Sequence, residues 1–172
     1  MLNITPPSPS QHPAYYQRYI DLVKQSNLID ALRINAESMD GFFKSLPYER
    51  FDFRYAPDKW SVKEVLLHVI DCERIFAYRA LRFSRNDKTP LPGFDENTYA
   101  PESFAAKRSA ESIHDEYKAV REATIQLFNN FSPEQLDRSG ISNNNEMSVR
   151  SFGYAIAGHE IHHLNVLKEK YL

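Results

Sequence analysis

A chain of 172 residues and 20.0 kDa has the size of one domain. Its net charge of −2 and pI of about 6.3 predict no attraction to nucleic acid or to an anionic membrane surface. No apolar run of about 18 residues and no secretory signal is visible, and the single cysteine, Cys72, excludes an intramolecular disulfide. We therefore expect a cytoplasmic protein that does not enter a membrane.

Ten prolines divide the sequence into long proline-free stretches, which are 14–46, 58–89, 102–132 and 134–172. Because proline breaks a helix interior, each stretch predicts one long helix. No Asn-Gly or Asp-Gly turn separates alternating apolar runs, so we expect no strands. The prediction is an all-α four-helix bundle over residues 14–172, preceded by a flexible proline-rich lead over 1–13.

Three of the predicted helices have start signals. Ser61 followed by Glu64 has the spacing of a capping box, which opens the helix within 58–89. The segment 101–103 (Pro-Glu-Ser) is expected to open the helix within 102–132, and Ser148 to cap the last one. The connection from Asn86 to Pro101 is long enough to run the length of a bundle. It predicts a crossover that makes the helices within 58–89 and 102–132 parallel, although an up-down-up-down arrangement stays open.

The last predicted helix carries three histidines within five residues. On a helical projection centred on its apolar face, His159 and His163 fall on the core side, whereas His162 falls on the flank. Imidazoles at positions i and i+4 of one helix can share a metal ion. A buried histidine pair needs some partner, because an unpaired buried polar group is costly.

His68 is the candidate for a third ligand. If the helices within 58–89 and 134–172 are antiparallel, His68 comes level with His159 and His163. Three neutral imidazoles would then hold one divalent ion with open positions, and imidazole suits zinc, nickel, copper and iron alike. The alternative is three core histidines that bond to carboxylates or carbonyl groups, and residue pattern alone does not decide between the two.

Other chemistries have weaker support. A di-iron carboxylate site would use Glu160-Ile161-His162-His163 and Glu111-Ser112-Ile113-His114, but Glu111 points away from its helix's apolar stripe. Cys72 is expected to be a small buried side chain rather than a ligand or nucleophile. There is no glycine-rich phosphate loop, and we assign no role to His12 or His114.

Several segments resemble the DinB/YfiT-like superfamily, in particular its second DinB-like branch. The resemblance extends from about residue 15 onward, and Gly-His-Glu-Ile-His-His-Leu-Asn-Val-Leu (158–167) is its most specific part. The other matching segments are 55–68, 68–79 and 90–97. It implies a four-helix bundle with a crossover, frequently a homodimer, that binds one divalent metal ion, zinc or nickel, through His68, His159 and His163.

The resemblance implies a metal-dependent hydrolase or a thiol S-transferase that acts on a small molecule. Two other classes stay open: a stress-response or ligand-binding module with a structural metal, and a metal-free bundle with an apolar pocket. No general base stands out among the polar residues near the site, which are Asp71, Glu73, Asp95, Tyr99, Glu160 and His162. Tyr154 and Ile161 are expected to face outward and to support the homodimer.

Overall fold

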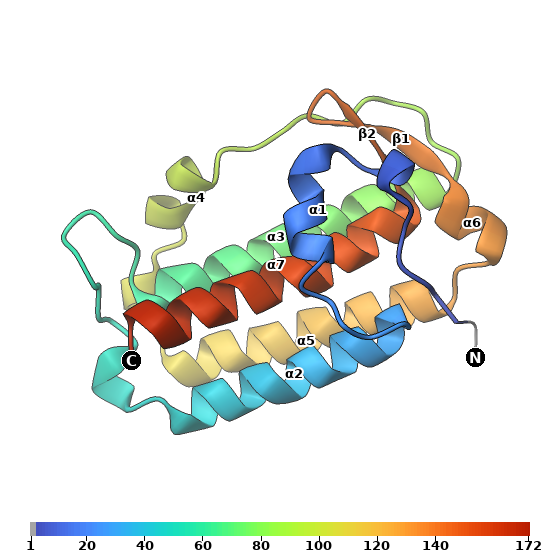
Figure 1. Ribbon diagram of the computed structural model, residues 1–172. Helices are drawn as coiled ribbons and strands as arrows, with labels where there is room; N and C mark the ends of the chain where they lie inside the picture. The colour runs from blue at the N-terminus through green and yellow to red at the C-terminus, as the bar shows by residue number, and fades with distance from the viewer. Residues whose placement is uncertain (1–2) are drawn as a thin grey trace.

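The computed structural model describes residues 3–172. Its core is a bundle of four long helices (Figure 1), which are α2 (Leu28–Ser45), α3 (Val62–Ser84), α5 (Ala110–Asn129) and α7 (Val149–Lys170). The shorter elements are η1 (Pro9–Gln11), α1 (Ala14–Ile20), η2 (Tyr48–Arg50), α4 (Glu96–Glu102), η3 (Ala105–Lys107) and α6 (Pro133–Asp137). The predicted four-helix bundle is confirmed, and none of the helices in residues 3–172 is long and apolar enough to cross a membrane.

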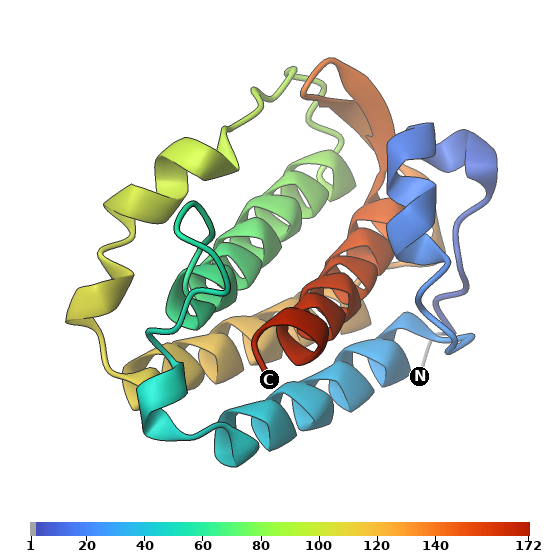
Figure 2. The same cartoon turned by 60° about the vertical axis from the view of Figure 1, so that its left-hand side comes forward.

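The bundle contains the predicted crossover. In Figures 1 and 2, α3 and α5 run in the same direction, and α2 and α7 run in the opposite one. The connection between α3 and α5 passes along the bundle and carries α4 and η3. α2 and α3 are consecutive long helices, yet they lie diagonally across the bundle, and each packs against α5 and α7. The antiparallel neighbours α3 and α7 make the most extensive helix contact.

Two of the three predicted helix starts are confirmed. The Ser61 hydroxyl accepts from the backbone N–H of Glu64, whose carboxylate accepts from the backbone N–H of Ser61. Ser148 caps α7 by accepting from the N–H of Ser151. The start at Pro101 is wrong, because Pro101 lies inside the short α4 and α5 begins only after Ser109. The cap of α5 is the Ser109 hydroxyl, which accepts from the N–H of Ser112.

A small β-hairpin corrects the expectation of no strands. Strands β1 (Ser139–Ser142) and β2 (Asn145–Ser148) are antiparallel, with Gly140 opposite Met147. Asn143 and Asn144 form the two-residue turn with φ values of 47° and 61°. This turn needs left-handed residues, a requirement that asparagine meets without glycine. Leu91 of the crossover bonds to the hairpin through its N–H, which donates to the Ile141 carbonyl group.

Helix α7 is the central element of the bundle, since α1, α2, α3 and the hairpin all contact it. Tyr154 is therefore fully buried, and its hydroxyl donates to the carbonyl oxygen of Ile4. The expectation that Tyr154 faces outward is wrong, and the homodimer stays a prediction. Residues 1–2 of the predicted lead lie outside the described residues, whereas Ile4 is part of the core. The domain boundary at residue 14 stays a prediction.

Candidate metal centre

Three imidazole rings meet between the antiparallel helices α3 and α7. His159 and His163 stand one turn apart on α7, and His68 faces them from α3. His159 Nε2 lies 3.1 Å from His68 Nε2 and 3.1 Å from His163 Nε2. The ring of His68 also contacts that of His163, with 4.8 Å between their centroids. The three predicted ligands are thus neighbours.

Hydrogen bonding alone does not satisfy this arrangement. A ring nitrogen of neutral imidazole either donates one hydrogen or accepts on one lone pair. His159 Nε2 therefore forms a hydrogen bond with either His68 Nε2 or His163 Nε2. The second of these nitrogens then contacts His159 Nε2 without a hydrogen bond. In a zinc site with Zn–N bonds of about 2.0–2.1 Å, two nitrogen ligands of one ion lie about 3 Å apart or slightly more. The 3.1 Å distances from His159 Nε2 to His68 Nε2 and to His163 Nε2 fit ligands of one ion.

The burial of the three rings keeps them neutral. Burial lowers the pKa of His68 to about 4, and burial together with the neighbouring histidines lowers the pKa of His163 to about 3. The same causes hold the pKa of His159 well below its ordinary value. A metal ion binds the unprotonated nitrogen, so the rings have the ligand form at neutral pH.

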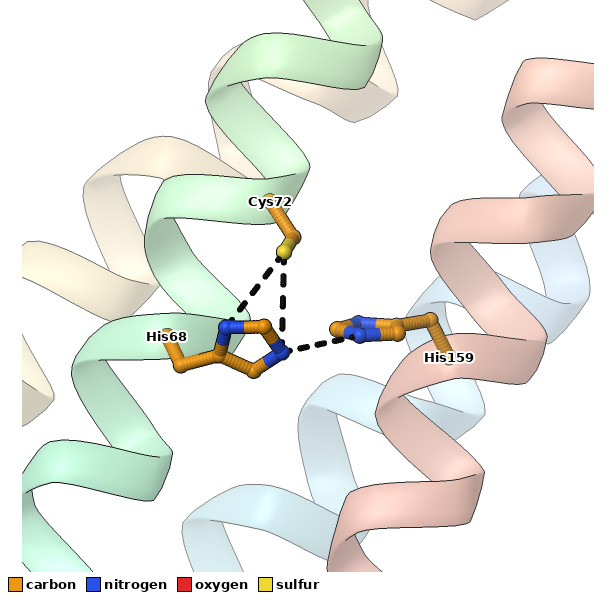
Figure 3. Close-up of side chains that lie close together, drawn as sticks. All are labelled: His68, Cys72 and His159. Carbon is orange, nitrogen blue, oxygen red and sulfur yellow. Dashed lines mark hydrogen bonds between the residues drawn. The ribbon is translucent and has the colours of Figure 1, made fainter. Parts of the chain in front are cut away.

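Cys72 adjoins the cluster one helical turn after His68 (Figure 3). Its Sγ lies 3.6 Å from His68 Nε2 and 3.7 Å from His68 Nδ1. The potential ligand atoms of His68, Cys72 and His159 all lie within 4.8 Å of one another, which makes Cys72 an alternative donor. Burial raises the pKa of the Cys72 thiol, so without a cation it stays protonated and is a poor ligand.

A cavity of about 520 Å³ opens beside the three rings. Its volume is in the range of sites for small molecules. Tyr19 of α1 packs edge-on against His159, and the Trp60 ring lies 4.9 Å from the His68 ring. Aromatic rings make much of the wall, with contributions from α1, the segment before α3, α3 itself and the crossover: Tyr15, Tyr16, Tyr19, Trp60, Phe76 and Phe94.

Behind α7, a polar network that sequence reasoning missed occupies the middle of the bundle. Arg121 is 2% exposed and donates through Nε and Nη2 to both oxygens of Glu73, at 2.9 and 2.8 Å. Its Nη2 also donates to Glu160 Oε2 at 2.5 Å, and the Tyr117 hydroxyl donates to Glu160 Oε1. Glu160 follows His159 directly, but its carboxylate points away from the rings into this network. A buried arginine on the apolar stripe of α5 would have been the only signal.

The other polar candidates lie outside the cluster. His162 lines the cavity on the flank, as predicted, with its ring edge-on to Tyr19. Glu73 belongs to the Arg121 network, and Asp71 has only a 4.0 Å contact with Arg74. Asp95 caps α4 by accepting from the N–H of Asn97, and Tyr99 is exposed. His114 lies 3.1 Å from Asp40 on the far side of the bundle.

Comparisons with known proteins agree with the fold. A family model described as the DinB superfamily matches residues 31–167. A curated relative from Oceanobacillus iheyensis, named "Putative metal-dependent hydrolase OB0413", is 29% identical over 126 residues, which cover 72% of each chain. Among solved structures, YfiT from Bacillus subtilis, described as "a probable metal-dependent hydrolase with an unusual four-helix bundle topology", matches with a TM-score of 0.65. That match has 14% identity and covers 95% of this chain and 89% of YfiT.

Proposed function

This chain belongs to the DinB superfamily, and from that premise we propose that it is a metal-dependent enzyme in which His68, His159 and His163 hold one divalent ion. The supporting observation is the convergence of three neutral ring nitrogens, with His159 Nε2 at 3.1 Å from each of the other two. The three imidazoles suit zinc or nickel. The names of the relatives from Oceanobacillus iheyensis and Bacillus subtilis point to the same class.

The reaction is hydrolysis or thiol S-transfer on a small molecule. A divalent ion with open coordination positions supplies Lewis acidity and lowers the pKa of a water molecule or thiol. The chain's own contribution is to hold the three imidazoles in fixed orientations by packing. Tyr19 and Trp60 press on the rings of His159 and His68 from the cavity side. The aromatic rings of the wall offer apolar surface to the body of a bound molecule.

Elemental analysis of the purified protein tests the ligand set. We expect about one zinc or nickel ion per chain, and loss of most of it in the double variant His68→Ala/His159→Ala. His162→Ala is the matched control, because His162 lies on the same helix between the two α7 ligands and is expected to leave the metal content unchanged. A double variant that keeps its full metal content would contradict the proposal.

A second experiment separates the three-histidine set from the set that contains Cys72. In the cobalt-substituted protein, a thiolate ligand gives an intense sulfur-to-cobalt charge-transfer absorption, which imidazole ligands do not give. We expect no such band in the wild-type protein and an unchanged metal content in Cys72→Ser. Appearance of the band, and its loss in Cys72→Ser, would make Cys72 a ligand in place of one histidine.

The alternative is a non-catalytic bundle whose metal is structural. Structural sites are closed by four protein ligands, whereas these rings border a cavity. The apolar core consists of two clusters of buried side chains, and neither cluster contains the three histidines. We therefore expect a chelator to abolish turnover and to lower the melting temperature by only a few degrees. Unfolding of the chelated protein at room temperature would favour the structural role.

A further inference from the structure

Arg79 occupies the cavity wall at some distance from the histidines. It follows His68 by eleven residues on α3, which returns a helix to nearly the same face about three turns later. The rise of the helix puts the two Cα atoms about 16 Å apart. Both side chains line the same cavity, so a molecule within it can meet the guanidinium group at one end and the imidazole cluster at the other.

The guanidinium group of Arg79 is buried without an acidic partner. The residue is only 4% exposed, and within residues 3–172 no carboxylate forms a salt bridge with it. Its Nη2 donates to the carbonyl oxygen of Pro92 at 2.8 Å, and its Cζ lies 5.9 Å from the ring centroids of Phe76 and Phe94. These neutral contacts do not balance the charge. Burial accordingly lowers the pKa of Arg79.

Arg121 provides the comparison within the same bundle. Its exposed fraction of 2% is close to the 4% of Arg79, but two carboxylates, Glu73 and Glu160, surround it. Burying an ion without a partner is strongly unfavourable, and for this reason such charges are normally paired. The difference between the two arginines is that Arg79 borders a cavity and Arg121 does not.

The rest of the cavity wall also suits an anion. The hydroxyl group of Tyr16 has no hydrogen-bond partner in the described part of the chain, and Tyr16 lines the cavity. At the rim, Arg18 donates only to the hydroxyls of Tyr15 and Tyr19. Among residues 3–172, the wall contains one carboxylate, that of Glu96, which is exposed and forms no salt bridge with Arg79.

We propose that Arg79 binds the carboxylate of the substrate, and that the cavity takes a small organic monoanion with an apolar, aromatic-sized body. A planar carboxylate matches the fork of a guanidinium group, and its single negative charge balances the single buried positive charge. The aromatic wall covers the apolar body, and the group to be transformed lies toward His68 and His159. The inference deepens the proposed function by naming the substrate class, and it rests on that function only for the reacting end.

The only tryptophan of the chain, Trp60, lies in the cavity wall, so its fluorescence reports binding without turnover. The probes are phenylacetate and its uncharged isostere phenylacetamide, titrated into the full-length protein near pH 7.5. We expect phenylacetate to bind at least about tenfold more tightly, as for a charge-assisted hydrogen bond in a buried site. In Arg79→Gln we expect this preference to fall below about threefold.

Arg82→Gln is the matched control, because Arg82 lies on the same helix, pairs with Asp87 and does not line the cavity. It removes the same charge and should keep the full preference. If Arg79→Gln does not fold, Arg79→Lys keeps the charge without the fork, and should keep a weakened preference for the carboxylate. Equal binding of the two probes by the wild-type protein, or an unchanged preference in Arg79→Gln, would overturn the inference.

Phenylphosphonate, largely a dianion at this pH, tests the charge of the ligand. Binding of phenylphosphonate more than tenfold tighter than phenylacetate would replace the monocarboxylate by a phosphate-like group and so overturn the inference as stated. An Arg79 that only fastens the crossover through Pro92 would change stability and leave the preference intact. Because the fluorescence signal needs no metal, a protein without metal would defeat the proposed function and still give a result here.

Discussion

At the scale of single residues, Arg121 is the group on which the middle of the bundle depends. It joins α5 to α3 through Glu73 and to α7 through Glu160, and its Nη1 donates to the Leu32 carbonyl of α2. Replacing it by leucine leaves two buried carboxylates without a counterion. We expect Arg121→Leu to lower the free energy of unfolding by about 3–5 kcal/mol, measured by urea denaturation.

The control for this prediction is Arg74→Leu. Arg74 also connects α3 to α5, through Glu116, but its side chain is 49% exposed. Exposed ion pairs contribute about 0–1 kcal/mol, so this variant should unfold at nearly the wild-type urea concentration. A loss of similar size in the two variants would mean that the buried network has no special role in stability.

The sequence predicts that the three histidines lie close together, whereas it does not predict the network around Arg121. His159 and His163 follow from the spacing of four residues on the core face, and His68 follows once α3 and α7 are taken as antiparallel. A helical projection assumes one apolar face, and it therefore puts Glu160 and Tyr154 off the core. From Val149 to Glu160, however, almost every residue of α7 is buried, since other elements surround the helix. A single sequence does not show which elements will pack around this helix.

At the scale of elements, α1 is seated on α7 through a close contact at Gly158. A Cβ atom on Gly158 would lie 1.9 Å from the backbone oxygen of Tyr19, which cannot move unless α1 moves. We expect Gly158→Ala to lower the free energy of unfolding by about 1–3 kcal/mol, the usual cost of overpacking. Thermal and urea denaturation measure this change.

Gly41→Ala is the matched control in a helix interior. Gly41 is exposed in α2, and a Cβ atom there would have no neighbour within 4 Å. Alanine loses less backbone entropy than glycine on folding, so this variant should be more stable by about 0.5–1 kcal/mol. If Gly158→Ala were stabilised to the same extent, the close seating of α1 would be refuted.

Local sequence signals predict some of the element boundaries and miss others. The capping box at Ser61 and the serine cap at Ser148 act within one turn, so they are visible in the sequence and are confirmed. Pro101 is not the start of α5, because it lies inside the short helix α4 and α5 begins only after Ser109. The sequence does not predict the hairpin, because its turn is formed by Asn143 and Asn144, whereas turns of this kind are usually recognised by a glycine.

At the scale of the whole molecule, the buried histidines make the metal-free protein sensitive to acid. The pKa is about 4 for His68 and about 3 for His163 in the folded chain, against about 6.5 in an unfolded chain. Between these values the unfolded state binds more protons, so stability decreases as the pH falls below about 6.5. We expect the urea midpoint of the chelated protein to decrease from pH 7 to pH 5.

The double variant His68→Gln/His163→Gln is the control for this pH effect. It removes two of the three histidines whose pKa is lowered, and it should lose less stability over the same pH range, because carboxylates elsewhere are unchanged. The metal-loaded wild-type protein should show a steeper dependence, since protons compete with the metal for the rings. A parallel decrease in the wild type and the double variant would assign the effect to other residues.

The diagonal placement of α2 and α3 has a consequence for synthesis on the ribosome. The first two long helices to be made pack against α5 and α7 rather than against each other, so their apolar faces stay uncovered while the crossover is translated. His68 and His159 are 91 residues apart in the chain, and the site forms only when α7 has docked. We expect nascent chains that end within α5 to be bound by chaperones, and those extended beyond α7 to be released.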